Sequence, residues 1–531
     1  MPDRHDAVVI GAGPNGLAAA NVLADEGWDV VVLEAESTPG GAVRSAETLE
    51  PGVVVDLFSA FYPMSIVSPV LRSLDLEAHG LEWCHAPDVL AHPTIEGPTA
   101  MVSRDPERTA ESLDAFHPGD GDAWLELLAE WTQVEERLVG ALMSPFPPVR
   151  GALGLARSLG VSGTADLART ALLPVRRMAE ERFGGDGGGL LLAGNALHTD
   201  LSPEAAASGF FGLMLAGIAQ THGWPVPRGG AQALTDALVR RLESRGGEVR
   251  CGARVDGITL SDGRAVGARV VDGTEVGASR AVLADVVAPA LYEQLLDLAD
   301  APADVRRDMG RYQRGSATFK VNWSVDGPVP WADPAVRGAG TVHLAESLDE
   351  LTMNMAQLAC GQLPSHPFML VGQMSTADAS RSPAGIESMW SYTSVPQSVR
   401  GDAGGDGLQG RWGDASSGEA ERFADRMEAR MEAFAPGFRD RIRHRHIQSP
   451  ADIEAADASL LGGDKSLGTA HLHQQLVFRP TIGLGRAETF VDGLYLASAS
   501  AHPGGGVHGA CGANAARAAL VHDRWRRLRS T

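Results

Sequence analysis

Two glycine-rich loops, close to opposite ends of the chain, have residue types and spacing that suit a dinucleotide. Both match G-x-G-x-x-G, and they are Gly11-Ala12-Gly13-Pro14-Asn15-Gly16 and Gly504-Gly505-Gly506-Val507-His508-Gly509. In such a loop the glycines permit a tight turn, bring the backbone close to a pyrophosphate and let a helix pack closely on a strand. The helix that follows offers free N–H groups and a partial positive charge to the phosphates. The two loops therefore indicate either two dinucleotide sites or one site built from both ends.

The first loop stands between the elements that this motif requires. The apolar run at residues 6–10 predicts a buried strand, residues 17–24 a helix and residues 29–33 a second strand. Glu34 ends that second strand, where an acid binds ribose hydroxyls, and Ala35 follows it. We therefore predict an adenine dinucleotide bound by the first loop, Glu34 and Ala35. The alternative is a tight helix–strand crossing that holds no ligand.

The second loop has a similar context but lies too near the end of the sequence for a separate domain. Residues 494–498 predict a strand and residues 509–527 a helix, and few residues follow. We expect this strand and helix to complete the sheet of the first domain. The loop would then face the other end of the same cofactor, because glycine lets the backbone pass close to a flat ligand. The alternative is a plain tight turn.

The intervening chain predicts one more cofactor segment and two inserted blocks. Residues 222–230, HGWPVPRGG, indicate a constrained loop before a helix, and the turns at Asp262-Gly263 and Asp272-Gly273 indicate a β-meander after it. We expect an α/β fold with a discontinuous Rossmann-type cofactor domain made of residues 1–70, 222–300 and 451–531. An inserted α+β substrate domain would comprise a mainly helical block, 71–221, and a mixed block, 301–450.

Four stretches of the sequence together resemble the phytoene desaturase-like oxidoreductases. They are LAGNALHTDLSP, HGWPVPRGGAQALTDAL, GSATFKVNWSVD and YLASASAHPGGGVHGACGANAAR. The resemblance is strongest to the branch named pyridine nucleotide-disulfide oxidoreductase domain-containing protein 2. It lies within a superfamily that includes the amine oxidases and the Rab GDP-dissociation inhibitors. The resemblance implies FAD as the cofactor, a p-hydroxybenzoate-hydroxylase-like fold and an apolar substrate.

The resemblance also implies which residues approach FAD. A Gly-Gly turn after the second strand, with an arginine close behind it, would lie at the diphosphate and the flavin side; these residues are Gly40, Gly41 and Arg44. The backbone of Val255 would meet the adenine. The C-terminal loop would lie at the flavin through Gly504, Gly505, Gly506 and Val507. The alternative for Arg44 is a surface turn with a solvated guanidinium.

Catalytic candidates come from lysine and histidine. Only two lysines occur, Lys320 and Lys465. Lys320 falls in an apolar strand, where burial of an ammonium group costs free energy unless the group is paired or has a function. The resemblance to amine oxidases implies that Lys320 holds a water at flavin N5; the alternative is a lysine on a strand edge in solvent. His502 and His508 flank the second loop and could donate to a substrate or flavin oxygen, or form local hydrogen bonds. An H-x-H pair at residues 471–473 has no third ligand in view, so we predict no metal site.

We expect an FAD-dependent oxidoreductase of the phytoene desaturase-like type. It would dehydrogenate a polyene, lipid-like or isoprenoid substrate by hydride transfer to flavin, with reoxidation by oxygen or a quinone. One alternative is a flavin amine oxidase, which needs an aromatic pair at the flavin; the candidates are Trp323, Trp390 and Tyr392. The other is a non-enzymatic prenyl-binding or lipid-binding protein of the GDP-dissociation-inhibitor type, against which Glu34 and the intact glycine loops argue.

The amino-acid composition limits the classes of binding partner and the cellular environment that we expect. The formal net charge of −22 disfavours a nucleic-acid partner, which would select a basic face. The four cysteines form no C-x-x-C pair, which indicates a reduced, cytoplasmic protein rather than a disulfide or zinc framework. No apolar run is long enough to predict a membrane-spanning helix. Peripheral contact with a membrane surface and the oligomeric state stay open.

Overall fold

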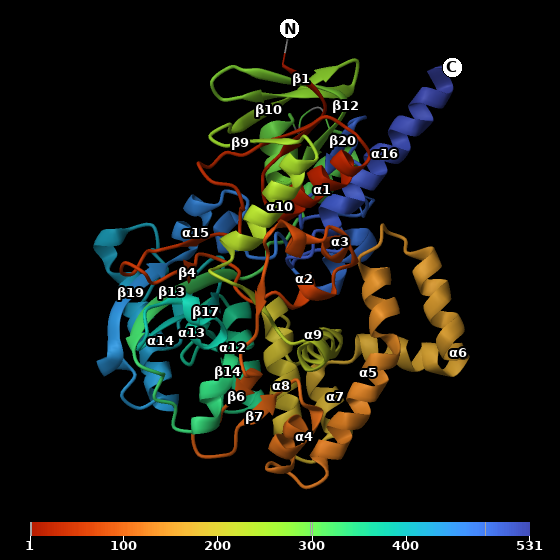
Figure 1. Ribbon diagram of the computed structural model, residues 1–531. Coiled ribbons are helices and arrows are strands. Elements are labelled where there is room, and N and C mark those ends of the chain that lie inside the picture. The colour runs from red at the N-terminus through yellow and green to blue at the C-terminus, as the bar shows by residue number, and fades with distance from the viewer. Residues whose placement is uncertain (1–2, 298, 300, 484, 531) are drawn as a thin grey trace.

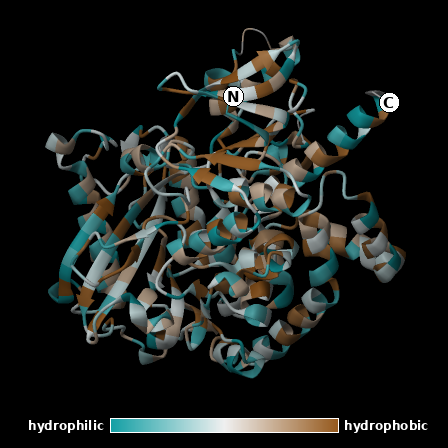
Figure 2. Ribbon diagram, turned by 45° about the horizontal axis from the view of Figure 1, so that its top comes forward, coloured by the Kyte–Doolittle hydropathy of each residue, from teal (hydrophilic) through white to brown (hydrophobic). Residues whose placement is uncertain are grey.

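The computed structural model describes residues 3–297, 299, 301–483 and 485–530. Figure 1 shows three parts: a sheet with its helices at the top, a second sheet at the lower left and a helical group at the lower right. The first strand and the last helix both belong to the upper part. Figure 2 shows hydrophobic stretches in the strands and inner helices, and mixed colours along the outer helices.

The first sheet takes its strands from three distant segments of the chain. Five parallel strands lie in the order β9-β2-β1-β12-β20, and β10 and β11 form an antiparallel meander on the first half of β12. Their bounds are β1 (Arg4–Ile10), β2 (Val30–Leu33), β9 (Glu248–Arg250), β10 (Val255–Ser261), β11 (Arg264–Val270), β12 (Glu275–Ala284) and β20 (Leu494–Leu496).

The C-terminal strand completes this sheet, as predicted. Leu494 and Leu496 of β20 pair with Val282 and Ala284 of β12, at the end of β12 that also pairs with β1. The strands β1 and β2 contain apolar runs because both faces of the sheet are covered, one by helices and the other largely by residues of the β10–β12 meander. The discontinuous α/β fold expected from the sequence is confirmed.

Three helices pack together beside this sheet: α1 (Pro14–Asp25), α10 (Gln232–Ser244) and α16 (Ala510–Ser530). Helix α1 begins at Pro14 because proline suits the first turn, where its missing N–H would have no intrahelical partner. Small residues let α16 cross α1 closely: a Cβ on Gly512 would lie 1.8 Å from the carbonyl oxygen of Asn15. The last helix therefore contacts the first glycine loop directly.

The second sheet has seven strands in the order β19-β13-β17-β16-β14-β6-β7. Strand β13, which lies next to the edge strand β19, is buried from Ala317 to Val325, and helix α14 covers it with Phe423, Met427 and Met431. The strand bounds are β6 (Asp88–His92), β7 (Ala100–Val102), β13 (Ala317–Asp326), β14 (Ala339–Leu344), β16 (Met369–Gln373), β17 (Ile386–Val395) and β19 (Ile442–Gln448). The covering helices are α12 (Leu348–Ala359) and α14 (Glu419–Phe434).

The block at residues 71–221 is not helical throughout. Its short apolar run DVLAH forms β6, which pairs in parallel with β14 and so joins the two inserted blocks in one sheet. Such a run is too short for a stable helix and its residues are buried on both faces. The helices of the block are α4 (Pro106–Asp114), α5 (Asp120–Leu142), α6 (Val149–Leu172), α7 (Val175–Arg182), α8 (Gly187–Ala196) and α9 (Ser208–His222).

Helices α8 and α9 form the interior of the helical group and pack on β6 and β7. Helix α6 lies outermost (Figure 1). Within the described residues, none of the helices combines the length and the apolar character needed to cross a membrane. The remaining short elements are β3 (Ser45–Ala46), β4 (Val55–Asp56), α2 (Pro63–Val67), α3 (Pro69–Ser73), β5 (Trp83–Cys84), β8 (Val226–Pro227), α11 (Ala303–Met309), β15 (Gln362–Leu363), α13 (Met374–Ala377), β18 (Gly401–Asp402) and α15 (Pro450–Ala456).

Candidate active site

One cavity of about 520 Å³ extends from the first sheet to the second sheet and the helical group. It brings together most of the cofactor residues predicted from the sequence. Those that line it are Gly11, Gly13, Pro14, Asn15, Glu34, Ala35, Gly41, Arg44, Val255, Gly505, Gly506 and Val507. Four others belong to the same loops but do not line the cavity; they are Ala12, Gly16, Gly40 and Gly504.

The first glycine loop and Glu34 form one end of the cavity. The carboxylate of Glu34 accepts hydrogen bonds from the backbone N–H of Ala12 at 2.7 Å and of Glu36 at 2.9 Å. These bonds hold the acid at the end of β2, where it faces the cavity beside Ala35. A Cβ on Gly16 would lie 2.1 Å from the carbonyl oxygen of Gly11, so the turn requires glycine there.

The Gly-Gly turn lies against the first loop. The N–H of Gly40 donates to the carbonyl of Ala12 at 2.9 Å, and a Cβ on Gly41 would lie 3.2 Å from the Cα of Gly13. Arg44 donates to the carbonyl of Gly41 at 2.8 Å and to that of Ala456 at 2.6 Å. Its guanidinium is therefore held along the cavity wall and is not a solvated surface group.

The C-terminal glycine loop forms another part of the cavity wall. Gly504 and Gly506 have φ angles of 111° and 121°, which side chains rarely tolerate. Gly505 packs on Ser466, whose Cβ would lie 3.2 Å from an added Cβ. Both ends of the chain thus contribute backbone to the same cavity.

Lys320 lies on β13 and lines this cavity, with only 3% of its surface exposed. Its Nζ donates to the carbonyls of Asp56 and Phe58, the latter at 3.1 Å, and lies 5.6 Å from the centre of the Trp390 ring. Burial lowers the pKa of Lys320 to about 7. The alternative of a solvent-exposed lysine on a strand edge is wrong.

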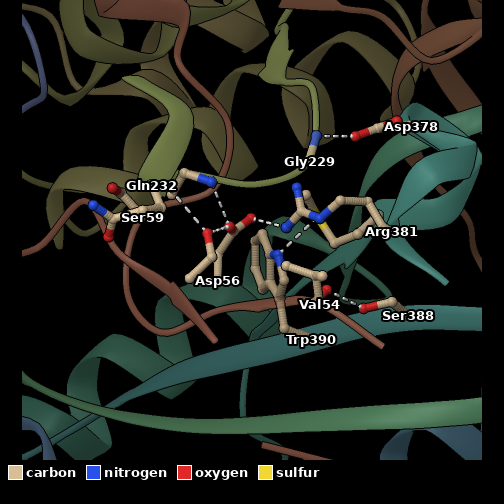
Figure 3. Close-up of polar contacts among 12 residues, drawn as sticks. Val54, Asp56, Ser59, Gly229, Gln232, Asp378, Arg381, Ser388 and Trp390 are labelled. Carbon is tan, nitrogen blue, oxygen red and sulfur yellow. Dashed lines mark hydrogen bonds and ion pairs between the residues drawn. The ribbon is translucent and has the colours of Figure 1, made fainter. Parts of the chain in front are cut away.

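A buried ion pair holds the segment that carries those carbonyls (Figure 3). Arg381 donates to the carboxylate of Asp56, and neither side chain is exposed. Asp56 also accepts from the N–H of Ala231 and the hydroxyl of Ser45, both at 2.8 Å. The pair ties the N-terminal segment to the second sheet and so positions the acceptors of the Lys320 ammonium.

The part of the cavity next to the second sheet and the helical group is mainly apolar. Trp390 and Tyr392 stack with ring centres 5.8 Å apart. Trp323, the third aromatic candidate, is fully buried away from the cavity and donates to Glu428 at 3.0 Å. Further apolar lining residues are Phe61, Tyr62, Met64, Phe211, Met214, Leu215 and Trp224.

Comparison with known proteins identifies the family. The model of the family "Flavin containing amine oxidoreductase" matches residues 15–381. The chain belongs to this family. It is 28% identical to mouse pyridine nucleotide-disulfide oxidoreductase domain-containing protein 2, over 97% of this chain and 93% of that protein.

Two further similarities agree with this assignment. The chain is 27% identical to the neurosporene-forming phytoene desaturase of Rhodobacter capsulatus, over 97% of this chain and 94% of that protein. The fold matches the crystal structure of an oxidoreductase from Methanosarcina mazei with a TM-score of 0.63 at 15% identity, over 97% of this chain and 99% of that chain. This member of the flavin-containing amine oxidoreductase family is an FAD-dependent oxidoreductase.

The cavity residues of this family member fit FAD. The N-terminus of α1 places the partial positive charge of a helix end at the cavity for a diphosphate, Glu34 supplies an acceptor for ribose hydroxyls, and the C-terminal glycines leave room for a flat ring. These features lie along one continuous cavity, as an extended dinucleotide requires.

Asp285, which directly follows β12, contacts the first glycine loop and was not among the residues predicted from the sequence. Its carboxyl accepts from the N–H of Gly16 at 2.7 Å, and a Cβ on Gly13 would lie 2.7 Å from its Oδ2. Burial raises the pKa of Asp285 to about 8, and the carboxyl groups of Asp457 and Glu34 add to this. A protonated Asp285 is compatible with a diphosphate at the same helix N-terminus. The sequence pattern that could have indicated Asp285 is an acidic residue directly after an apolar strand.

The two histidine candidates lie outside the cavity lining. His502 lies 3.2 Å from the carbonyl oxygen of Ser144, and its ring packs on Phe146. His508 accepts from the N–H of Ala510 at 3.0 Å and thereby caps the start of α16. Over the described part of the chain, no cluster of metal-ligating side chains occurs, and His473 pairs with Gln313 instead.

Proposed function

We propose that this protein dehydrogenates an apolar substrate, a polyene, lipid-like or isoprenoid molecule. The observation that carries the proposal is the apolar, aromatic wall that continues directly from the cofactor end of the cavity. Such a wall binds a hydrocarbon chain through the removal of apolar surface from water and excludes water from the reacting bond. The name of the Rhodobacter capsulatus relative, a phytoene desaturase, supports the same substrate class.

FAD, when bound, accepts a hydride from a C–H bond and passes the electrons to oxygen or a quinone. The chain's own residues orient the substrate and manage protons. The stacked rings of Trp390 and Tyr392 provide a flat surface against which a conjugated or branched chain packs. We assign Lys320 the role of proton donor. Two of its three N–H groups are directed at carbonyls, and the third is available to a molecule in the cavity.

An amine oxidase is the second candidate, since Trp390 and Tyr392 line the cavity as an aromatic pair. Two lysines, Lys320 and Lys465, line it as well. Lys465 is paired with Asp200, so the apolar lining of the cavity, and not its charge, is what favours an apolar substrate.

The direct test is anaerobic reduction of the bound flavin. We expect polyene or isoprenoid candidates to bleach the absorbance at about 450 nm, because FAD takes up the hydride. Primary amines of similar size are the comparison. Reduction by amines alone would establish the amine oxidase reaction and overturn the proposed one.

Replacement of Lys320 by Met tests its role. We expect Lys320→Met to keep FAD bound and to slow reoxidation of the reduced flavin by oxygen at least about tenfold, because it removes a buried proton donor. Stopped-flow absorbance measures the rate, and Lys320→Arg, which keeps the donors, is the conservative control. An unchanged reoxidation rate in Lys320→Met would remove Lys320 from the mechanism.

A further inference from the structure

A polar cluster interrupts the apolar wall of the cavity beside the C-terminal glycine loop. His198 and Lys465 line the cavity, and Asp200 and Tyr392 support Lys465. Lys465 directly precedes Ser466, which packs on Gly505, so the cluster lies next to the cofactor loop. The reaction proposed above gives no role to His198 or Lys465.

Lys465 is held in place by a carboxylate and a ring. Its Nζ donates to both oxygens of Asp200, at 2.9 and 3.0 Å, and lies 5.4 Å from the centre of the Tyr392 ring. The hydroxyl of Ser394 donates to Asp200 at 2.7 Å and fixes that carboxylate. The pair is neutral overall, and an ammonium has three N–H groups, so one remains for a molecule in the cavity.

His198 is held by a second buried histidine. Its Nε2 lies 2.8 Å from the Nε2 of His343, and its ring packs edge-on against Trp224. Burial, with the nearby charge of Lys465, lowers the pKa of His198 to about 3, and burial lowers that of His343 as well. Both rings are therefore neutral, and one of the two Nε2 atoms must carry the shared proton.

The hydrogen bonding of His343 decides which ring donates. Its Nδ1 is buried and has no partner within the described residues. A buried N–H without a partner is rarer than a buried lone pair without one, so we place the proton of His343 on Nε2. His343 then donates to His198, and His198 carries its own proton on Nδ1. Both His198 and Lys465 can thus donate.

We propose that His198 and Lys465 form a donor pair that binds an oxygen atom of the substrate. The substrate is then an apolar molecule with a carbonyl or carboxylate group, not a plain hydrocarbon. This inference rests on the proposed function and narrows its substrate class. A hydrocarbon in the cavity would displace water from both donors and leave them unpaired, and each unpaired donor weakens binding by about tenfold.

The test compares three probes of one carbon skeleton: farnesoic acid, farnesal and farnesene. Binding to the oxidised holoenzyme is measured by flavin difference absorbance and by quenching of tryptophan fluorescence, since Trp224 and Trp390 line the cavity. We expect the acid or the aldehyde to bind at least about tenfold more tightly than farnesene. A tighter acid identifies carboxylate recognition, and an equally tight aldehyde identifies carbonyl recognition.

Variants separate the donors from general packing. His198→Phe keeps the ring against Trp224 and should remove most of the preference for oxygenated probes while farnesene binding is kept. Lys465→Met with Asp200→Asn removes both charges of the pair together and should do the same. The matched control is His366→Phe, which replaces an exposed histidine and should keep the wild-type preference.

Three results would overturn the donor pair: equal binding of farnesene, no binding of either oxygenated probe, or an unchanged preference in His198→Phe. Failure of the proposed function has a different signature. In that case no apolar candidate reduces the flavin, whichever probe binds. Reduction by a hydrocarbon that binds as tightly as the acid would keep the proposed function and remove the donor pair.

Discussion

Asp285 governs the charge at the cofactor loop. Its carboxyl is buried against Gly16 at the start of α1 and close to Glu34 and Asp457, which are also acidic. Removal of a carboxylate from water disfavours the charged form, and the neighbouring acids act in the same direction. A single proton on Asp285 therefore decides whether the N-terminus of α1 faces a neutral or a negatively charged carboxyl group.

The pH dependence of this residue has a definite sign. The pKa of Asp285 is raised from 3.8 to about 8, so the folded apoprotein keeps a proton that the unfolded chain releases. Its contribution to stability is fully present below the unfolded value and is lost as pH rises towards 8. We expect Asp285→Asn, which still accepts from Gly16, to stabilise the apoprotein at pH 9 by at least about 1.4 kcal/mol. The gain should be smaller at pH 5.

Thermal unfolding of apoprotein at the two pH values measures this effect. The control is Asp262→Asn in the exposed turn between β10 and β11. We expect this variant to leave the stability of the apoprotein unchanged at both pH values. A gain for Asp285→Asn that is equal at both pH values would contradict the raised pKa.

At the scale of elements, the crossing of α1 and α16 decides the position of the first glycine loop. Asn15 stands in the first turn of α1, and the backbone of Gly512 in α16 lies directly against it. Gly509, at the start of α16, packs on Ala18 in the same way. The second G-x-G-x-x-G match thus supplies both cavity wall and helix contact.

Gly512→Ala tests this crossing. An added Cβ would lie 1.8 Å from a backbone carbonyl, which no side-chain rotation relieves, so the helices must separate. We expect a loss of at least about 2 kcal/mol in the free energy of unfolding, together with weaker FAD binding. Urea unfolding and flavin content measure the two effects.

The matched control is Gly154→Ala in α6, where an added Cβ meets nothing within 4 Å. Alanine is the better helix former, so this variant should be neutral or up to about 1 kcal/mol more stable. Equal stability of the two variants would show that the crossing tolerates a wider spacing than the structure has.

At the scale of the whole molecule, the cavity joins parts that are distant in sequence. Its walls come from the first sheet, the second sheet and the helical group. A ligand that contacts all three stabilises the folded state by mass action, because the unfolded chain offers no such surface. We therefore expect bound FAD to stabilise the folded protein as well as to serve as its cofactor.

Removal of FAD should lower the thermal stability of the protein. At free FAD about 100 times its Kd, we expect about 2.7 kcal/mol of added stability over the apoprotein. ADP at the same concentration should give a smaller shift, since it reaches the Glu34 end of the cavity but not the C-terminal glycines. Differential scanning fluorimetry measures the shifts. An equal shift with ADP would mean that the C-terminal loop adds nothing to binding.

Local patterns in the sequence were sufficient for the elements around the two glycine loops and for the family. The strand–loop–helix around Gly11 and the strand before Gly504 depend on short-range spacing, and so both were predicted correctly. The rarity of lysine singled out Lys320 without showing whether it was buried. Block 71–221 was expected to be mainly helical, yet β6 became a strand because β14 was there to pair with it.

Only the tertiary structure decided which groups meet. Asp285 reaches Gly16 across 269 positions of sequence, and Asp56 reaches Arg381 across 325. Burial, which sets the charge of Asp285 and Lys320, depends on the packing of three parts of the chain around one cavity. The sequence by itself therefore determined the kind of fold and its cofactor. The fold alone determined which polar groups face the substrate, because contacts between distant residues leave no local pattern to read.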